Sequence, residues 1–307
     1  MELSFIILEQ TIMLFLIMIV GVICYKTKII TKEGNKQLSD IMMKIVMPAM
    51  VFNAYQTADY STKLLTGLGQ GFILSLVFFV ITIPVSMIIF RKSDKYEYSI
   101  ERFSTIYTNC AFMGFPLIDG IFGAEGILYT TSFVTLFNIF VWTHGIMVMK
   151  NEVSFKSFLN ALKSPALIAV VVGIICYLFR LTIHSVPLSA IGFVASMNTP
   201  LAMIIAGATI AQTNILKTLK KARIYLVTIV RLLIIPFIMV FVMKLFGVSN
   251  TVYVSIVIAS SCPTATIGTL FAIKYDKNAI YVSEIFAVTT LLSAISLPLI
   301  VYVSQMI

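Results

Sequence analysis

The sequence predicts an all-α membrane protein whose ten transmembrane helices form two inverted five-helix repeats, with helices four and nine broken where they cross. Three observations lead to this fold class: a low charge content, apolar runs of spanning length and an internal repeat. Of the 307 residues, 59% are apolar and 11% are charged, and the mean hydropathy is +1.01. A soluble domain would carry about 25% charged residues, so the composition indicates a chain embedded in a lipid bilayer.

Ten apolar runs are long enough to cross the hydrocarbon core, which takes about 20 helical residues. No basic flank or small-residue cleavage site accompanies the first run, so we expect it to be a retained span rather than a signal peptide. The connections are too short to hold a soluble domain. The predicted spans are 5–25, 39–57, 66–90, 103–122, 125–149, 164–181, 187–211, 222–246, 251–273 and 279–304.

Basic residues in the connections predict the orientation. Of the 22 Lys and Arg, two lie inside spans, three follow even-numbered spans, and the remaining 17 follow odd-numbered spans. Because Lys and Arg gather on the cytoplasmic side, the odd-numbered connections are expected there, with both termini outside the plasma membrane. The net charge of +9 is scattered over short loops, so nucleic acid is not an expected partner.

An internal repeat at an offset of 152 positions divides the chain. The matching residues are Gly21–Tyr25 (GVICY) and Gly173–Tyr177 (GIICY), Pro48 and Pro200, and Cys110 and Cys262. The predicted units, residues 1–150 and 151–307, hold five spans each. Because five is odd, the second unit must be inverted relative to the first, which is an architecture of secondary transporters.

Two stretches interrupt the apolar pattern at mid-depth, Thr108–Gly120 (TNCAFMGFPLIDG) in span four and Ser260–Gly268 (SSCPTATIG) in span nine. Backbone breaks within a membrane are tolerated where the freed groups face protein or a watery cavity. If both helices break, two helix N-termini with positive dipole ends converge and favour an anion. The alternative is a pair of Pro-kinked packing helices. The predicted substrate-binding residues are Asn109, Gly114, Pro116, Ser261, Pro263 and Thr264.

Ionisable groups inside spans cost about 2.5–3.5 kcal/mol at a helix centre, which makes each of them a functional candidate. Arg231 would pair with an acid or attract an anion, Glu284 would couple protons, Asp119 would act as a gate or cation ligand, and His144 would relay protons. A purely structural role is the alternative for each of these four. The four cysteines show no metal-ligand spacing, so no metal or cofactor is expected, and protons or sodium are the candidate coupling ions.

The patterns in spans four and nine resemble those of a known family. Span four has Asn109, Met113–Leu117 (MGFPL) and Phe122-Gly123, and span nine has Pro263 and Phe271–Tyr275 (FAIKY). This combination resembles the auxin efflux carrier family, which includes bacterial permeases for malate-like acids and the plant PIN-type auxin exporters. The similarity covers essentially the whole chain.

The resemblance implies ten helices, a scaffold part and a transport part that moves against it. It also implies that Asn109, Gly114, Pro263 and Thr264 contact a substrate carboxylate. After Pro48 the sequence reads Ala-Met-Val-Phe, without the Ser that plant members carry there, and their long cytoplasmic loop is missing. These departures favour a generic small organic acid over auxin.

The sequence therefore predicts a secondary transporter that moves a small organic anion by alternating access. The family resemblance favours efflux as the direction of transport. An anion channel is the first alternative, but a channel needs a continuous polar lining, whereas these polar residues cluster at one depth. An intramembrane enzyme is the second alternative, and no catalytic constellation supports it. The expected partners are the substrate anion and the lipid bilayer, and a homodimer is expected only from the general habit of such proteins.

Overall fold

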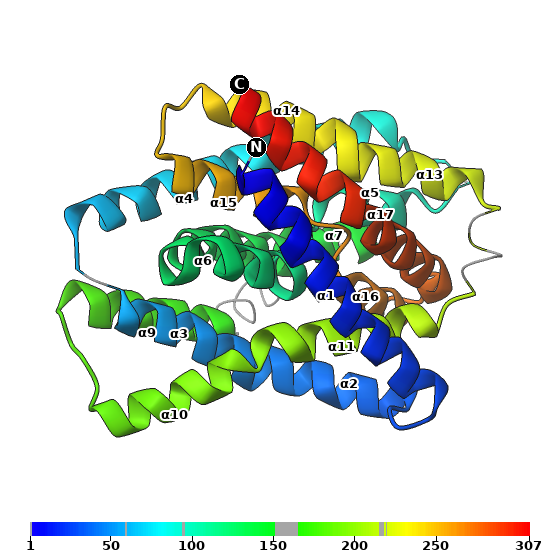
Figure 1. Cartoon of the computed structure of the whole chain (residues 1–307). Coiled ribbons are helices and arrows are strands. Elements are labelled where there is room, and N and C mark those ends of the chain that lie inside the picture. Colours follow the sequence, from blue (N-terminus) through cyan, green and yellow to red (C-terminus); the bar gives the residue numbers. More distant parts are fainter. Residues whose placement is uncertain (1, 59, 94–95, 151–164, 215–217, 219) are drawn as a thin grey trace.

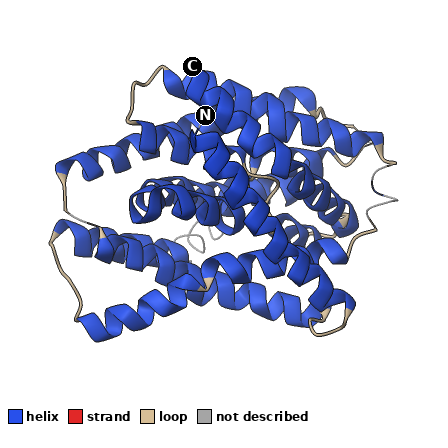
Figure 2. Ribbon diagram, viewed as in Figure 1, coloured by secondary structure: helices blue, strands red, loops and turns tan. Residues whose placement is uncertain are grey.

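The fold is known from a computed structural model that describes all residues except 1, 59, 94–95, 151–164, 215–217 and 219. Four basic residues used to predict the orientation, Lys95, Lys156, Lys163 and Lys217, lie outside the described residues. The part that is described consists of helices and loops without a strand (Figure 2), which confirms the all-α class.

The helices run in the following order. They are α1 (Glu2–Lys26), α2 (Lys32–Ile41), α3 (Met47–Thr57), α4 (Thr62–Ile89), α5 (Tyr98–Ile106), α6 (Phe115–Phe140), α7 (Ile146–Lys150), α9 (Pro165–Leu178), α10 (Ser185–Ser196), α11 (Asn198–Ala211), α13 (Ala222–Ile229), α14 (Ile235–Lys244), α15 (Asn250–Ser261), α16 (Ile267–Lys274) and α17 (Ala279–Met306). Four π-helical turns join or extend them: η1 (Met42–Val46), η2 (Cys110–Gly114), η3 (Val141–Gly145) and η4 (Val230–Ile234).

Six helical stretches within the described residues are long and apolar enough to cross a membrane: Ile6–Lys26, Thr62–Ile89, Cys110–Lys150, Ser185–Ala211, Ala222–Lys244 and Ala279–Met306. Two shorter apolar helices are α9 and α15. Predicted spans four and five share the stretch that begins at Cys110, because they are joined without a loop at Gly123, whose φ of +56° is non-helical. Glycine reaches this region at little steric cost, so the chain turns there directly.

Two helix pairs pack along each other: α1 with α11, and α3 with α9 (Figure 1). Glycines allow the first pair to come close. A Cβ on Gly207 would lie 1.9 Å from the carbonyl oxygen of Met18, and a Cβ on Gly21 would lie 2.2 Å from that of Ile204. Small residues are the usual means by which membrane helices bring their backbones together.

A second group of helices surrounds α6, which contacts α4 and α15, while α17 contacts α13, α14, α15 and α16. Aromatic side chains fill the space between α4, α5 and α6. The Phe79 ring stacks on Phe140 with 4.4 Å between centroids, and the Phe103 and Tyr107 rings lie 4.5 Å apart. This packing surrounds the C-terminal end of α5, where the helix breaks.

Candidate functional site

Two helix breaks meet inside the protein. Helix α5 ends at Ile106 and η2 begins at Cys110, while α15 ends at Ser261 and α16 begins at Ile267. Between the two helices of each pair the chain leaves the regular helix, and Thr108 pairs with Thr264 in an antiparallel bridge. The Asn109 N–H donates to the Pro263 carbonyl at 2.7 Å, and the Ala265 N–H donates to the Tyr107 carbonyl at 2.9 Å. We call these two segments, 107–109 and 262–266, the crossing.

Pro263 accounts for the second break, and Gly114 for the close approach of the two broken helices. Pro263 has no N–H to continue α15, and its carbonyl is free to accept from Asn109. Pro116 lies in the first turn of α6, directly after the π-helical turn η2, and such turns are common where proline disturbs helical bonding. A Cβ on Gly114 would lie 3.2 Å from Cys262 Sγ and 3.8 Å from Ala259 Cα, so a glycine lets η2 approach α15.

Two polar side-chain atoms, Asn109 Nδ2 in the crossing and Ser261 Oγ directly before its second segment, are buried without a hydrogen-bond partner. Asn109 is 4% exposed and Ser261 is 1% exposed. A buried polar group that lacks a partner typically costs about 1–3 kcal/mol. The crossing therefore holds hydrogen-bonding capacity that a ligand or water would satisfy.

Thr264 differs from these residues because its polar groups are bonded within the protein. Its hydroxyl donates to the Ser104 carbonyl at 2.8 Å, and its N–H lies 3.3 Å from Thr289 Oγ1. Thr264 thus fastens the second break to α5 and α17. The Pro263 carbonyl is likewise occupied by Asn109. Among the predicted site residues, Asn109 and Ser261 are the two whose side chains retain free capacity.

Arg231, in η4, is fully buried and bonds to backbone carbonyls instead of the acid considered from the sequence. Its Nε and Nη2 donate to the Cys262 carbonyl at 2.9 and 2.8 Å, and Nη1 donates to the Thr105 carbonyl at 3.1 Å. Nη2 also donates to the Ser260 carbonyl. One guanidinium therefore joins the C-terminal ends of α5 and α15 just before each break.

The other three charged or titratable candidates lie away from the unpartnered atoms. His144 Nδ1 is 2.9 Å from the hydroxyl of Tyr107, which also donates to the Phe140 carbonyl. His144 thus touches a residue of the crossing. Glu284, in α17, accepts from Lys221 Nζ at 2.7 Å, and Asp119 is exposed on α6 four residues before Gly123.

Sequence reasoning missed the buried ion pair of Glu101. This carboxylate is fully buried and accepts from Arg223 Nε at 2.7 Å and Nη2 at 2.9 Å, with the Tyr281 hydroxyl 3.2 Å away. The pair ties α5 to α13 and α17. Its sequence signal is weak, since Glu101 sits beside Arg102 in what reads as loop charge.

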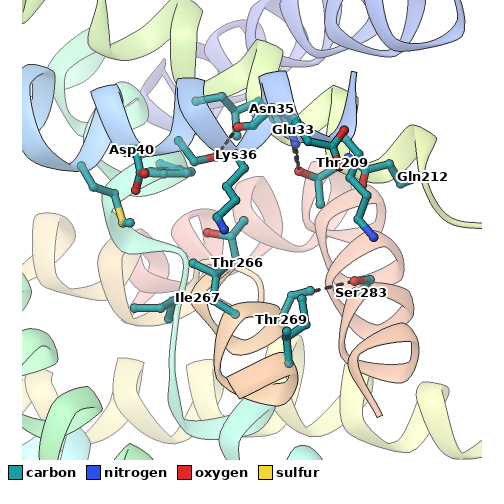
Figure 3. Close-up of a pocket in the computed structure, with 17 residues that line it drawn as sticks. Glu33, Asn35, Lys36, Asp40, Thr209, Gln212, Thr266, Ile267, Thr269 and Ser283 are labelled. Carbon is teal, nitrogen blue, oxygen red and sulfur yellow. Dashed lines mark hydrogen bonds between the residues drawn. The ribbon is translucent and has the colours of Figure 1, made fainter. Parts of the chain in front are cut away.

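A cavity of about 350 Å³ leads to the crossing. One wall is formed by α2 and α11, and the other by η2, α16 and α17. Figure 3 shows Lys36 extending from α2 toward Thr266. Phe112 and Thr266 both line the cavity, which places its inner end beside η2 and the second break.

Polar pairs stand on both cavity walls. Asn35 Nδ2 donates to Thr209 Oγ1 at 2.9 Å on one wall, and the hydroxyls of Thr269 and Ser283 are 3.2 Å apart on the other. Within the described residues, no group of three or more His, Cys, Asp or Glu is placed to hold a metal ion. The polar groups of the cavity are therefore hydroxyls, amides, two lysine ammonium groups and two carboxylates, among apolar side chains.

Comparison with known proteins adds a family match. A family model described as "Membrane transport protein" matches residues 6–301. A protein of Methanothermobacter thermautotrophicus, described as an uncharacterized transporter, is 24% identical over 95% of this chain and 96% of its own length. A second uncharacterized transporter, from Methanocaldococcus jannaschii, is 24% identical over 92% of this chain and 94% of its own length.

Proposed function

The chain belongs to the membrane transport protein family, and from that premise we propose that it is a secondary transporter of a small organic anion that works by alternating access. The family match confirms the resemblance to auxin efflux carriers found in the span-four and span-nine motifs. It also places the chain among integral membrane transporters rather than enzymes. The substrate class and the mechanism are our proposals, argued below.

We propose that residues 1–150 and 151–307 form two inverted repeats and together supply ten spans. Three pairs of helix boundaries support this division, because they keep the 152-residue offset of the sequence repeat. Helices α1 and α9 end at 26 and 178, α5 and α15 begin at 98 and 250, and α6 and α16 begin at 115 and 267.

The packing is reciprocal as well. In the proposed numbering, the first span of each unit packs on the second span of the other, as α1 on α11 and α9 on α3. A pseudo-two-fold axis requires this exchange, and inverted repeats related by such an axis are common in secondary transporters. We propose that these four helices are the scaffold part and that the helices around the crossing are the transport part.

The observation that carries the proposed function is the cavity lined by Phe112 of η2 and Thr266 of the second break, because buried, unpartnered polar atoms lie on the same two broken segments, at Asn109 and Ser261. One wall is formed by α11 of the proposed scaffold part together with α2, and the other by helices of the proposed transport part, so movement of one part against the other would close the cavity. Because basic residues gather on the cytoplasmic side and the connection before α2 is basic, the cavity would open to the cytoplasm. Both termini would then lie outside the plasma membrane. On the other side of the protein, the Tyr55 and Thr131 hydroxyls are 2.8 Å apart and buried, which supports a closed outer gate.

A carboxylate fits the proposed site for two reasons. The helices beginning at Cys110 and Ile267 direct their N-terminal ends toward the crossing, where positive dipole ends favour an anion. Asn109 Nδ2 is a buried donor without a partner, so it offers a directed hydrogen bond. Protons or sodium are the proposed coupling ions, and His144 is a candidate proton carrier because it is bonded to Tyr107 of the crossing.

Counterflow in proteoliposomes tests the proposal. Vesicles loaded in turn with unlabelled malate, malonate, lactate or indole-acetate are assayed for uptake of the same labelled acid at trace concentration. We expect saturable exchange with at least one acid, reduced more than tenfold by Asn109→Ala because a charge-assisted hydrogen bond contributes about 1.5–3 kcal/mol. Repeating the assay with imposed proton and sodium gradients identifies the coupling ion.

The matched control is Asn138→Ala, which removes an amide that bonds only to the Val134 carbonyl of its own helix. This variant should exchange like the wild type. Exchange that survives Asn109→Ala would move the site away from the crossing. Folded wild-type protein that exchanges none of the four acids would contradict the proposed substrate class.

A further inference from the structure

Arg231 carries a full positive charge into the protein interior, and the bonds of its guanidinium go to the backbone. Its four hydrogen bonds reach the carbonyls of Thr105, Ser260 and Cys262. Its other close neighbour is the Phe78 ring, whose centroid lies 5.8 Å from the guanidinium carbon. An isolated buried charge is strongly unfavourable, so these carbonyls are the groups that offset it.

The carbonyls belong to two helix C-termini, and this fixes the charge balance at the crossing. Each helix end behaves as roughly half an elementary charge, negative at the C-terminus and positive at the N-terminus. The C-terminal ends of α5 and α15 together amount to about one negative charge, which the guanidinium matches. The N-terminal ends at Cys110 and Ile267 then leave about one positive charge without a counter-charge.

We infer that Arg231 makes the crossing selective for a substrate group with a single negative charge, by neutralising the carbonyl ends of the two broken helices. Arg231 acts through these helix ends and does not touch the substrate, so it is a positioning residue. The inference rests on the proposed transport function and specifies the charge of the substrate at the same site.

Two independent observations fit a single negative charge. The unpartnered Asn109 Nδ2 is a buried donor at the start of η2, as a bound carboxylate requires. The cavity beside the crossing is lined by Lys32, Lys36 and Glu33 and by Asp40, which pairs with Lys44 at 3.2 Å. Because acids accompany the lysines, the lining is not the strongly basic surface that a dianion favours.

The charge balance at the crossing determines how the exchange rate depends on membrane potential. When the transport part holds one substrate anion and no coupling ion, Arg231 and the anion together have no net charge, whereas without the anion the positive charge of Arg231 is left. Exchange of labelled for unlabelled acid uses only the loaded form. It should therefore be insensitive to voltage in the wild type, although one uncompensated charge moved across 100 mV would change a rate by up to about 50-fold.

The test uses the full chain in proteoliposomes, in sodium-free buffer without a pH gradient, with whichever of the two monoanions, lactate or indole-acetate, gives the faster counterflow. Faster counterflow of malate or malonate, which carry two negative charges at neutral pH, would overturn the inference. Potentials of 0 and −100 mV are set with potassium and valinomycin. For the wild type we expect exchange rates equal within twofold. For Arg231→Gln we expect an apparent KM raised more than tenfold and exchange that has become voltage-dependent, while Arg231→Lys, which keeps the charge but makes fewer bonds, stays closer to the wild type in both respects.

Size-exclusion profiles and thermal unfolding separate a folding defect from a charge effect, and the wild-type voltage measurement needs no variant at all. Voltage-dependent wild-type exchange would overturn the inference, and so would folded Arg231→Gln with an unchanged KM. Either result leaves the transport function standing. Absence of wild-type exchange with every acid would instead refute the proposed function on which the inference rests.

Discussion

Replacing Gly207 by alanine should push α1 and α11 apart. The added Cβ would lie 1.9 Å from the Met18 carbonyl oxygen, 2.9 Å from its carbonyl carbon and 3.0 Å from the Val22 nitrogen. All three neighbours are backbone atoms, so no side chain can rotate away and one helix must shift. Overpacking of a filled interior costs about 1–3 kcal/mol, and the gain from replacing a helical glycine is about 1 kcal/mol.

Because the clash is with backbone, we expect the upper part of that range and a net loss of about 1–2 kcal/mol. At roughly 2–4 °C per kcal/mol for a protein somewhat smaller than this one, the melting temperature of detergent-solubilised protein should fall by about 2–8 °C. The matched control is Gly69→Ala in α4, where an added Cβ meets nothing within 4 Å. A Gly207→Ala variant as stable as this control would refute the close packing of α1 on α11.

Two further predictions concern the charged residues. Glu101→Gln should lower the melting temperature more than Glu284→Gln. Glu101 is fully buried and its partner Arg223 is 28% exposed, whereas the Lys221 partner of Glu284 is 47% exposed and more easily solvated. Thermal unfolding of both variants compares them directly, and equal shifts would contradict the structural role of Glu101. Lys36→Cys should react with a membrane-impermeant maleimide only from the cytoplasmic side and Lys63→Cys only from outside, in intact cells and inverted vesicles with the wild type as background. The opposite pattern would reverse the proposed orientation.

The all-α membrane class and the approximate place of the breaks were predictable because they depend on local chemistry. Composition alone indicates a membrane protein, and each interrupted stretch contains part of a break: Pro263 lies within the second break, whereas Gly114 and Pro116 lie in the helical turns that follow the first. Proline removes a backbone donor wherever it stands, so an interruption of helical hydrogen bonding can be predicted from the sequence without knowing the tertiary contacts. The division of the α6 stretch at Gly123 was likewise close to the predicted boundary between spans four and five.

The partners of the charged residues were not predictable, because they depend on which segments meet. The guanidinium of Arg231 bonds to carbonyls that every residue possesses, so no residue type in the sequence signals the contact. Glu101 and Arg223 are 122 positions apart, and each reads as ordinary loop charge. The pairing of Thr108 with Thr264 also requires the two breaks to be antiparallel, which is a property of the assembled fold.

The position of Arg231 bears on how a transporter can favour an anion and still release it. A cation in direct contact with the substrate would form a buried ion pair, and separating such a pair is strongly unfavourable. Arg231 instead bonds to the C-terminal ends of α5 and α15, so its charge is offset by carbonyl groups of the same transport part. The substrate would then meet only helix N-termini and the amide of Asn109, whose attraction is weaker and is replaced by water on opening. An arginine placed behind the crossing can thus set the sign of the site without holding the substrate too tightly to let it go.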